Sequence, residues 1–212
     1  MPAPAIGEIT TIEQADGNHF FIGTGSGLFR AGIGDGSLKL LSDETVESIS
    51  TPVHELYYHV VSKQLFIGSY KEGVLIYDME GTGKIIPCQS PNNVEINQIV
   101  ALNAHELLVA TGGKGVYKLD MNTCMSEPYI TADYSSYNGM NGNNINDIYV
   151  DEEERIWLAN YPTGITVRNN RYGSYDLIRH SLGNSRSLVN DQVHDVFCLL
   201  YTSDAADDSL RV

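Results

Sequence analysis

The chain has 212 residues, of which 42% are hydrophobic and 19% are charged, a composition that is ordinary for a globular protein and argues against disorder. Asp and Glu number 27 against 13 Lys and Arg, so the formal net charge is −14. An acidic surface of this size repels phosphate backbones and anionic lipid, so we expect no nucleic-acid partner and no membrane contact within this segment.

A repeated strand pattern runs along the chain, with three large apolar residues followed by a small residue and a short polar one. The four copies are Phe20–Thr24, Leu65–Ser69, Leu107–Thr111 and Ile156–Asn160. Each copy precedes a turn and a second strand that begins with glycine and a branched or aliphatic residue. These glycines are Gly27, Gly73, Gly115 and Gly164, which lie 46, 42 and 49 residues apart.

A further strand signal precedes each copy and occurs five times in all. Its copies are Ile6–Ile9, Val53–Leu56, Ile96–Ile99, Ile145–Ile148 and Val193–Val196. A weaker fourth strand follows in some units, at Ser37–Leu41, Lys84–Pro87 and Tyr175–Arg179. Units of roughly 40 to 45 residues with four short antiparallel strands are typical of propeller blades.

The sequence therefore predicts an all-β fold, a fragment of a β-propeller that forms an open arc. We expect about four four-stranded antiparallel blades and the first strand of a fifth. The predicted ranges are approximately 6–41, 53–87, 96–130 and 145–180 for the blades and 193–197 for the start of the next.

Metal, cofactor and disulfide chemistry find little support in the sequence. Cys88, Cys124 and Cys198 show no paired spacing, so neither a disulfide framework nor a zinc knuckle can be read from them, and the redox compartment stays open. His54 and His59 are five residues apart in a strand, which places them on opposite faces. We expect no metal site, no cofactor and no catalytic residues in this segment.

The third position of the repeated first strand is polar in every copy. The residues are Glu8, Glu55, Gln98, Asp147 and Asp195. This strand lines the central channel of a propeller, so we expect these side chains to line a wet, acidic channel. Solvation of the channel without any binding is the alternative.

The second group of candidate residues lies in loops that emerge on one face of the blades. Tyr70 and Tyr161 lie between second and third strands, and Tyr134, Tyr137 and Asn144 lie in the long connection before the fourth unit. Aromatic faces beside amides suit sugar rings, so we predict a ligand site here, with ordinary exposed loop residues as the alternative.

Two segments carry a resemblance to a known family, the two-component regulator propeller repeat. Gly23–Phe29 resembles its blade core, and Ser187–Val193 resembles its connection between blades. The resemblance covers Glu8 to about Phe197. The sequence departs from the family pattern at Asp151–Glu154, where Asp-x-x-Gly is usual and where we expect a solvated turn, and at Asn103–His105.

The resemblance implies a non-catalytic sensor segment, placed in the periplasmic or other extracytoplasmic part of a bacterial inner-membrane protein. It also implies an oligosaccharide ligand, kinase domains downstream in the same chain and a homodimer in the full-length form. A propeller lyase or hydrolase of the streptogramin-lyase kind and a protein-interaction scaffold are the alternatives. Residues 198–212 resemble a translated sequencing adapter, so we leave them out of the fold prediction.

Overall fold

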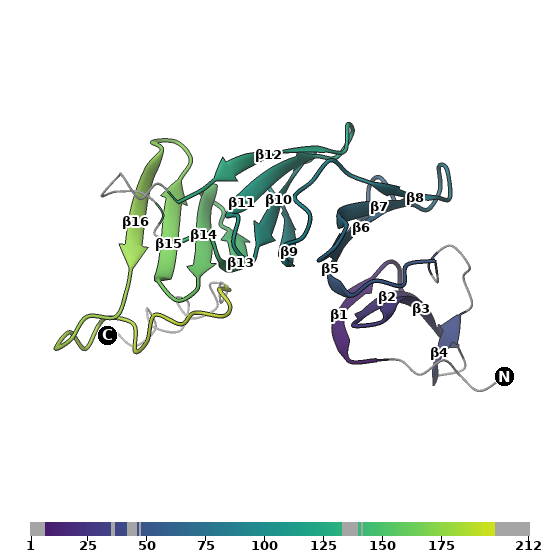
Figure 1. The fold of residues 1–212 in the computed structure, drawn as a ribbon, viewed down its shortest axis with the longest axis horizontal. Coiled ribbons are helices and arrows are strands. Elements are labelled where there is room, and N and C mark those ends of the chain that lie inside the picture. Colours follow the sequence, from purple (N-terminus) through teal and green to yellow (C-terminus); the bar gives the residue numbers. More distant parts are fainter. Residues whose placement is uncertain are drawn as a thin grey trace, which may run out of the picture.

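Four four-stranded antiparallel sheets make up the protein in a computed structural model, which describes residues 7–34, 37–41, 46, 48–132, 140 and 142–197. Figure 1 shows these sheets following one another along an open arc. The predicted all-β, propeller-like arrangement is therefore confirmed. Tyr134, Tyr137 and the tail from Cys198 lie outside the described residues.

We call the sheets blades 1 to 4 in chain order. Blade 1 consists of β1 (Ile9–Gln14), β2 (His19–Thr24), β3 (Gly27–Gly34) and β4 (Ser37–Leu41). Blade 2 consists of β5 (Val53–His59), β6 (Gln64–Ser69), β7 (Gly73–Asp78) and β8 (Ile85–Pro87). Blade 3 consists of β9 (Ile96–Ala101), β10 (Glu106–Thr111), β11 (Val116–Asp120) and β12 (Met125–Ile130). Blade 4 consists of β13 (Ile145–Val150), β14 (Arg155–Asn160), β15 (Gly164–Asn169) and β16 (Ser174–Ile178).

Each blade is a simple meander, so its first strand lies at the inner edge of the arc and its fourth at the outer edge (Figure 1). The turn after the second strand needs glycine because it adopts positive φ and passes close to the next connection. Gly73 has a φ of 76°, and a Cβ there would lie 2.5 Å from the carbonyl oxygen of Pro91. Gly115 has a φ of 81°, and its Cβ would lie 2.5 Å from the carbonyl oxygen of Ile130.

The hydrophobic core is divided among the contacts between successive blades, which we call joints. One buried cluster lies at each of the three joints. Leu65 and Ile67 belong to the joint with blade 1, whereas Phe66 between them belongs to the joint with blade 3. All three side chains are fully buried. The continuous apolar runs of the second strands therefore reflect sheets that are covered on both faces.

Trp157 occupies the position in β14 that Phe21, Phe66 and Leu108 occupy in the other second strands. Those three residues pack in the joint with the following blade. Trp157 is only half-buried, and its Nε1 donates a hydrogen bond of 2.7 Å to Oδ2 of Asp151. The guanidinium of Arg155 lies 5.6 Å from the centre of its ring. Trp157 thus lies on the face of blade 4 that would pack against a further blade.

The turn at Asp151–Glu154 is solvent-exposed at Glu152, Glu153 and Glu154, as expected, whereas the side chain of Asp151 is largely buried. Oδ1 of Asp151 accepts hydrogen bonds from the amides of Glu153 at 3.1 Å and Arg155 at 2.8 Å. Its side chain is only 9% exposed and also pairs with the Arg155 guanidinium at 2.6 Å. Asp16 and Asn103 make equivalent side-chain turns in blades 1 and 3. Asp151 is therefore a structural anchor of its hairpin.

Candidate functional site: inner strands and loop face

The inner strands β1, β5, β9 and β13 share an irregularity at their second residue. The pairing with the neighbouring strand skips one residue in each, at Thr10, His54, Asn97 and Asn146. A residue in such a bulge is released from its own sheet's hydrogen-bond ladder, so its side chain is free to contact another element.

Three of these bulged residues bind the next unit of the chain. Oγ1 of Thr10 donates a hydrogen bond to the carbonyl oxygen of Val53 at 2.5 Å. Nδ2 of Asn97 donates to the carbonyl oxygen of Ile145 at 2.7 Å, and Nδ2 of Asn146 to that of Val193 at 3.0 Å. The polar second position was visible in the sequence, but its role as a connector was not predicted.

The predicted channel residues at the third position also contact the next unit. Oε1 of Glu55 accepts a hydrogen bond from the amide of Ile99 at 3.5 Å. Gln98 accepts one from the amide of Ile148. Oδ2 of Asp147 accepts one from the amide of Val196 at 2.7 Å. Each side chain therefore links its blade to the inner strand that follows.

The predicted fifth inner strand is present as a docked segment rather than as a strand. Val193–Phe197 has no assigned strand, yet Val193 and Val196 make the same two contacts with blade 4 that Ile145 and Ile148 of β13 make with blade 3. Figure 1 shows the chain after β16 returning to the inner edge of the arc. Asp195, the predicted channel residue of this unit, is exposed and hydrogen-bonds to the carboxyl group of Asp147.

In blade 1 the strand pairing corrects the predicted position. Glu55 lies opposite Gly68 in blade 2, but the residue opposite the equivalent Gly23 is Thr11, not Glu8. Glu8 is exposed at the start of the strand. Glu13 is the acidic residue that reaches blade 2, because its Oε1 accepts a hydrogen bond of 2.8 Å from the amide of Tyr58. The comparison of the repeats matched Glu8 with Glu55 because both are acidic. Matching by the residue that lies opposite the small residue of the second strand instead pairs Thr11 with Glu55.

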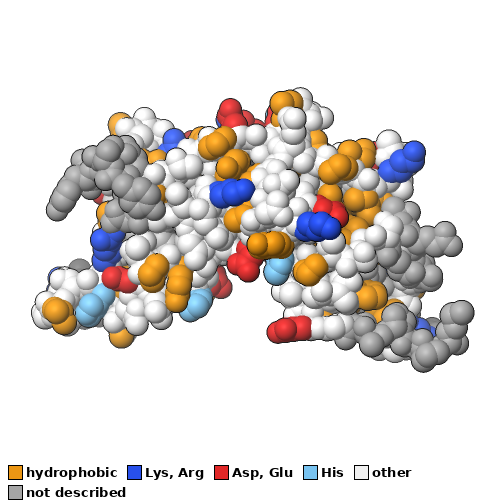
Figure 2. All heavy atoms as spheres, in the orientation of Figure 1, with side chains coloured by type: hydrophobic (Ala, Val, Ile, Leu, Met, Phe, Trp, Pro, Cys, Tyr) orange, Lys and Arg blue, Asp and Glu red, His pale blue; other side chains and the backbone are white. Residues whose placement is uncertain are grey.

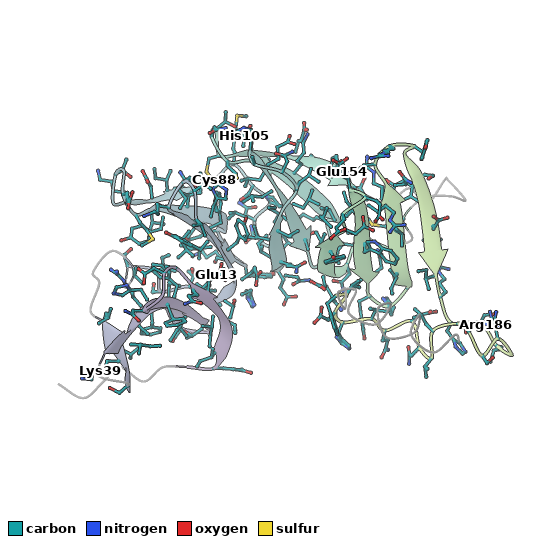
Figure 3. The ribbon with its side chains drawn as sticks, turned by 180° about the vertical axis from the view of Figure 1, so that it is seen from behind. Glu13, Lys39, Cys88, His105, Glu154 and Arg186 are labelled. Carbon is teal, nitrogen blue, oxygen red and sulfur yellow. A yellow bond between two sulfur atoms is a disulfide. The ribbon has the colours of Figure 1, made fainter. Side chains whose placement is uncertain are left out.

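Burial of the inner-strand acids favours their neutral forms. Burial, together with the negative charges of Glu13 and Asp147, raises the pKa of Glu55 to about 7. Burial and the hydrogen bond with Asp195 raise the pKa of Asp147 to about 6. Burial also raises the pKa of Glu13, against the opposing effect of the Tyr58 amide. Figure 3 labels Glu13 at the inner side of the arc, and Figure 2 shows acidic side chains along this concave edge.

On the loop face, two of the predicted ligand residues lie together. The amide of Tyr161 donates a hydrogen bond of 3.0 Å to the carbonyl oxygen of Asn144. The ring of Tyr161 lies 6.2 Å from the ring of His194, a residue that the loop-face prediction did not include. Tyr70 is 48% exposed on the corresponding turn of blade 2, and no contact joins it to Tyr161 among the residues described.

Two hollows, each of about 550 Å³, lie beside the turn that carries Tyr70. They share Glu72, Pro87 and Asn92. The first is also lined by Gln89, Ser90, Tyr117 and Ser126, and the second by Ser48, Ser50, Thr51 and Lys71, among others. Their linings combine hydroxyl, amide and charged groups with one aromatic ring. Sequence reasoning did not find them, because they are formed by segments from three blades.

A disulfide between Cys88 and Cys124 joins blades 2 and 3 at the outer side of the arc (Figure 3). Their Cα atoms are 4.8 Å apart although the residues are separated by 36 positions in sequence. The amide of Gln89 donates to the carbonyl oxygen of Cys124 at 2.8 Å, which holds the two segments side by side. The cysteine spacing did not indicate this bond, because no short spacing motif marks a disulfide between repeats.

The structure also shows where the histidines and acids considered in the sequence lie relative to one another. Among the residues that the structure describes, no group of three or more His, Cys, Asp or Glu could hold a metal ion. His54 and Glu55 belong to blade 2, whereas His194 and Asp195 follow blade 4. Within the same residues, no helix is long and apolar enough to cross a membrane.

No known protein-family profile matches the chain, and no curated protein matches it. Solved structures do. The extracellular domain of BT4673 from B. thetaiotaomicron, described as a one-component system, is 17% identical with a TM-score of 0.68 over 90% of this chain and 24% of that one. The extracellular domain of BT3049 from the same organism, described as a hybrid two-component system, is 16% identical with a TM-score of 0.65 over 83% of this chain and 25% of that one.

The computationally designed protein Ika8 is 12% identical with a TM-score of 0.55 and is matched over 76% of this chain and 46% of its own. Identities this low establish a shared fold and nothing finer. The chain spans about a quarter of the length of the two bacterial domains. In fold, it is similar to a segment of the extracellular domains of bacterial signalling systems.

Proposed function

We propose that this chain is a segment of a non-catalytic, ligand-sensing propeller in a bacterial two-component signalling protein. The observation that carries the proposal is the loop face of blade 2, where two hollows adjoin the exposed Tyr70 and share Glu72 and Asn92. The likeness in fold to the extracellular domains of BT4673 and BT3049 supports the placement in a signalling system.

An oligosaccharide is the ligand that this surface suits best. Sugar rings present hydroxyl groups around their edges and C–H groups on their faces, so they bind where amides and hydroxyls surround an aromatic ring. The first hollow offers Gln89, Asn92 and Ser126 beside Tyr117. The second continues from it past Pro87, so the two together suit an extended chain of sugar units. Tyr161 and Asn144 would bind a branch of such a ligand at blade 4.

An extracytoplasmic location is part of the same proposal. The Cys88–Cys124 disulfide supports it, because disulfides persist in oxidising compartments such as the periplasm. The full-length protein would place this segment on the outer side of the inner membrane, with kinase domains downstream in the same chain and a homodimer as the signalling unit. Ligand binding on the loop face would then shift the blades relative to the following domain.

A glycan-binding screen of the purified 212-residue chain tests the proposal, followed by calorimetry with each glycan that binds. We expect Tyr70→Ala and Asn92→Ala to weaken binding about tenfold or more, since each removes a stacking or hydrogen-bonding group. Tyr172→Ala is the matched control, because Tyr172 is 80% exposed in the β15–β16 turn, away from both hollows. A screen without binding, or equal losses in all three variants, would refute the oligosaccharide site.

A further inference from the structure

The joints between blades contain acidic side chains that serve as hydrogen-bond acceptors. We call Glu13, Glu55, Asp147 and Asp195 the inner acid row. We propose that the inner acid row makes the joints acid-sensitive, so that proton uptake on Glu55 and Asp147 tightens the joints and proton release loosens them. This proposal is independent of the ligand site, because it concerns the inner edge of the arc rather than the loop face.

The geometry of the joints carries the proposal. Glu13, Glu55 and Asp147 each accept a hydrogen bond from a backbone amide of the next unit, at Tyr58, Ile99 and Val196 respectively. A change of charge on any of these carboxyl groups therefore occurs at a contact between two blades. The hydrogen bond from the amide itself favours the ionised carboxyl group, so the gain from protonation comes from relief of the burial of a charge and of the repulsion between acids.

The charges around Glu55 are of one sign. Those that act on it are Glu13 on β1 and Asp147 on β13. Tyr57 on β5 itself has its pKa raised by burial and by Glu13. The adjoining strands β6 and β9 contain no titratable side chain, and in β2 His19 pairs with Asp16 at 2.8 Å. Proton release from Glu55 thus adds a negative charge beside the negative charges of Glu13 and Asp147.

Asp147 is in a similar position at the contact between blade 4 and the segment Val193–Phe197. Its carboxyl group is hydrogen-bonded to that of Asp195, and two carboxyl groups this close cannot both ionise without strong repulsion. Arg155 on the adjacent strand β14 is bound to Asp151 and Glu153 instead. Glu106 on β10 is paired with Lys118. Asp147 therefore depends on a proton, rather than on a cation, to relieve the repulsion.

The direction of the effect follows from the pKa shifts. The pKa of Glu55 rises from 4.5 to about 7 on folding, and that of Asp147 rises from 3.8 to about 6. The folded chain therefore binds more protons than the unfolded chain in this range. The stabilising contribution is complete below the unfolded values and is lost as the pH rises through about 6 to 7.

In blade 3, the residue equivalent to Glu55 is neutral and does not titrate. Gln98 occupies the third position of β9 and accepts a hydrogen bond from the amide of Ile148, as Glu55 does from Ile99. A neutral amide therefore fills this structural role in the native chain. It follows that Glu55→Gln should retain the hydrogen bond while it removes the charge.

Amide chemical shifts measured by NMR across pH test the proposal directly on the 212-residue chain. We expect the amide of Ile99 to titrate with a midpoint of about 7 and that of Val196 with a midpoint of about 6. Midpoints near the ordinary values of 4.5 and 3.8 would overturn the proposal, since the joints would then be ionised at all physiological pH.

Thermal unfolding of variants tests the consequence for the joints. We expect the Tm of the native chain to be roughly 5 °C higher at about pH 5 than at about pH 8, and Glu55→Gln with Asp147→Asn to abolish at least half of this difference. Glu152→Gln, in an exposed turn, controls for general charge repulsion and should leave the difference unchanged. Equal profiles for the double variant and the control would refute the proposal. Should the double variant not fold, the amide titration of the native chain still decides.

Discussion

The amide of Val196 donates a hydrogen bond of 2.7 Å to Oδ2 of Asp147, across the face at which blade 4 ends. Gln98 and Ile148 make the same contact between blades 3 and 4. With the neighbouring contact from Asn146 to Val193, the first of these pairs joins side chains of blade 4 to main-chain groups of the segment that follows it. The side-chain connectors should therefore contribute measurably to stability.

Asn97→Ala should lower the stability of the chain by about 1 kcal/mol, because the variant loses the hydrogen bond to the carbonyl oxygen of Ile145. Chemical denaturation monitored by circular dichroism measures the loss. Asn122→Ala is the control, since Asn122 lies in the exposed β11–β12 turn. Equal stability of the two variants would contradict the role of Asn97 as a connector.

Glu154→Gly should stabilise the chain by about 0.5 to 1 kcal/mol. Glu154 has a φ of 61°, a conformation that is unfavourable for a residue with a side chain and that glycine adopts readily. It ends the turn anchored by Asp151, where the resembling family has glycine. Glu152→Gly in the same turn serves as the control, and a loss of stability in Glu154→Gly would show that its side chain has a role that the contacts do not reveal.

Reduction of the Cys88–Cys124 disulfide should lower stability by about 3 kcal/mol, because it releases a loop of 36 residues in the unfolded chain. Thermal unfolding with and without a reducing agent measures this. Cys88→Ser, Cys124→Ser and the double variant should all match the reduced chain. A further loss on reduction of the double variant would mean that the agent acts elsewhere.

Trp157→Ala should cost much less stability than Phe66→Ala, although the two residues occupy equivalent positions. Phe66 is fully buried in the joint between blades 2 and 3, so its truncation should cost about 3 to 5 kcal/mol. Trp157 lies half-buried on the outward face of blade 4. Since it is the only tryptophan, quenching of its fluorescence by acrylamide reports its exposure directly. Resistance to quenching would show that another surface covers this face.

The strands were predictable because each unit repeats the same order of apolar, small and polar residues. Leu65–Ser69 and Leu107–Thr111 are continuous apolar runs because both sheet faces are covered. The third-position residues were also found, but as channel residues, since a sequence alone does not show that Asp147 reaches the amide of Val196. Glu13 was missed for the same reason.

Other features depend on spatial proximity between repeats, which a single sequence does not specify. Cys88 and Cys124 meet because blades 2 and 3 pack side by side, not because of their spacing. The hollows around Pro87 combine the connection after blade 1, a turn of blade 2 and strands of blade 3. Each of these could be located only after the blades had been placed against one another.

The bulge at the second position of every inner strand gives the arc a direction. Blades 3 and 4 each offer a side-chain donor and a side-chain acceptor to the unit that follows, and that unit supplies a main-chain carbonyl and a main-chain amide. Because these are main-chain groups, this part of the joint makes few demands on the sequence of the next unit, whereas the buried cluster of each joint requires matching apolar side chains. A unit added to such an array would need both the bulge and apolar side chains that fit the neighbouring sheet.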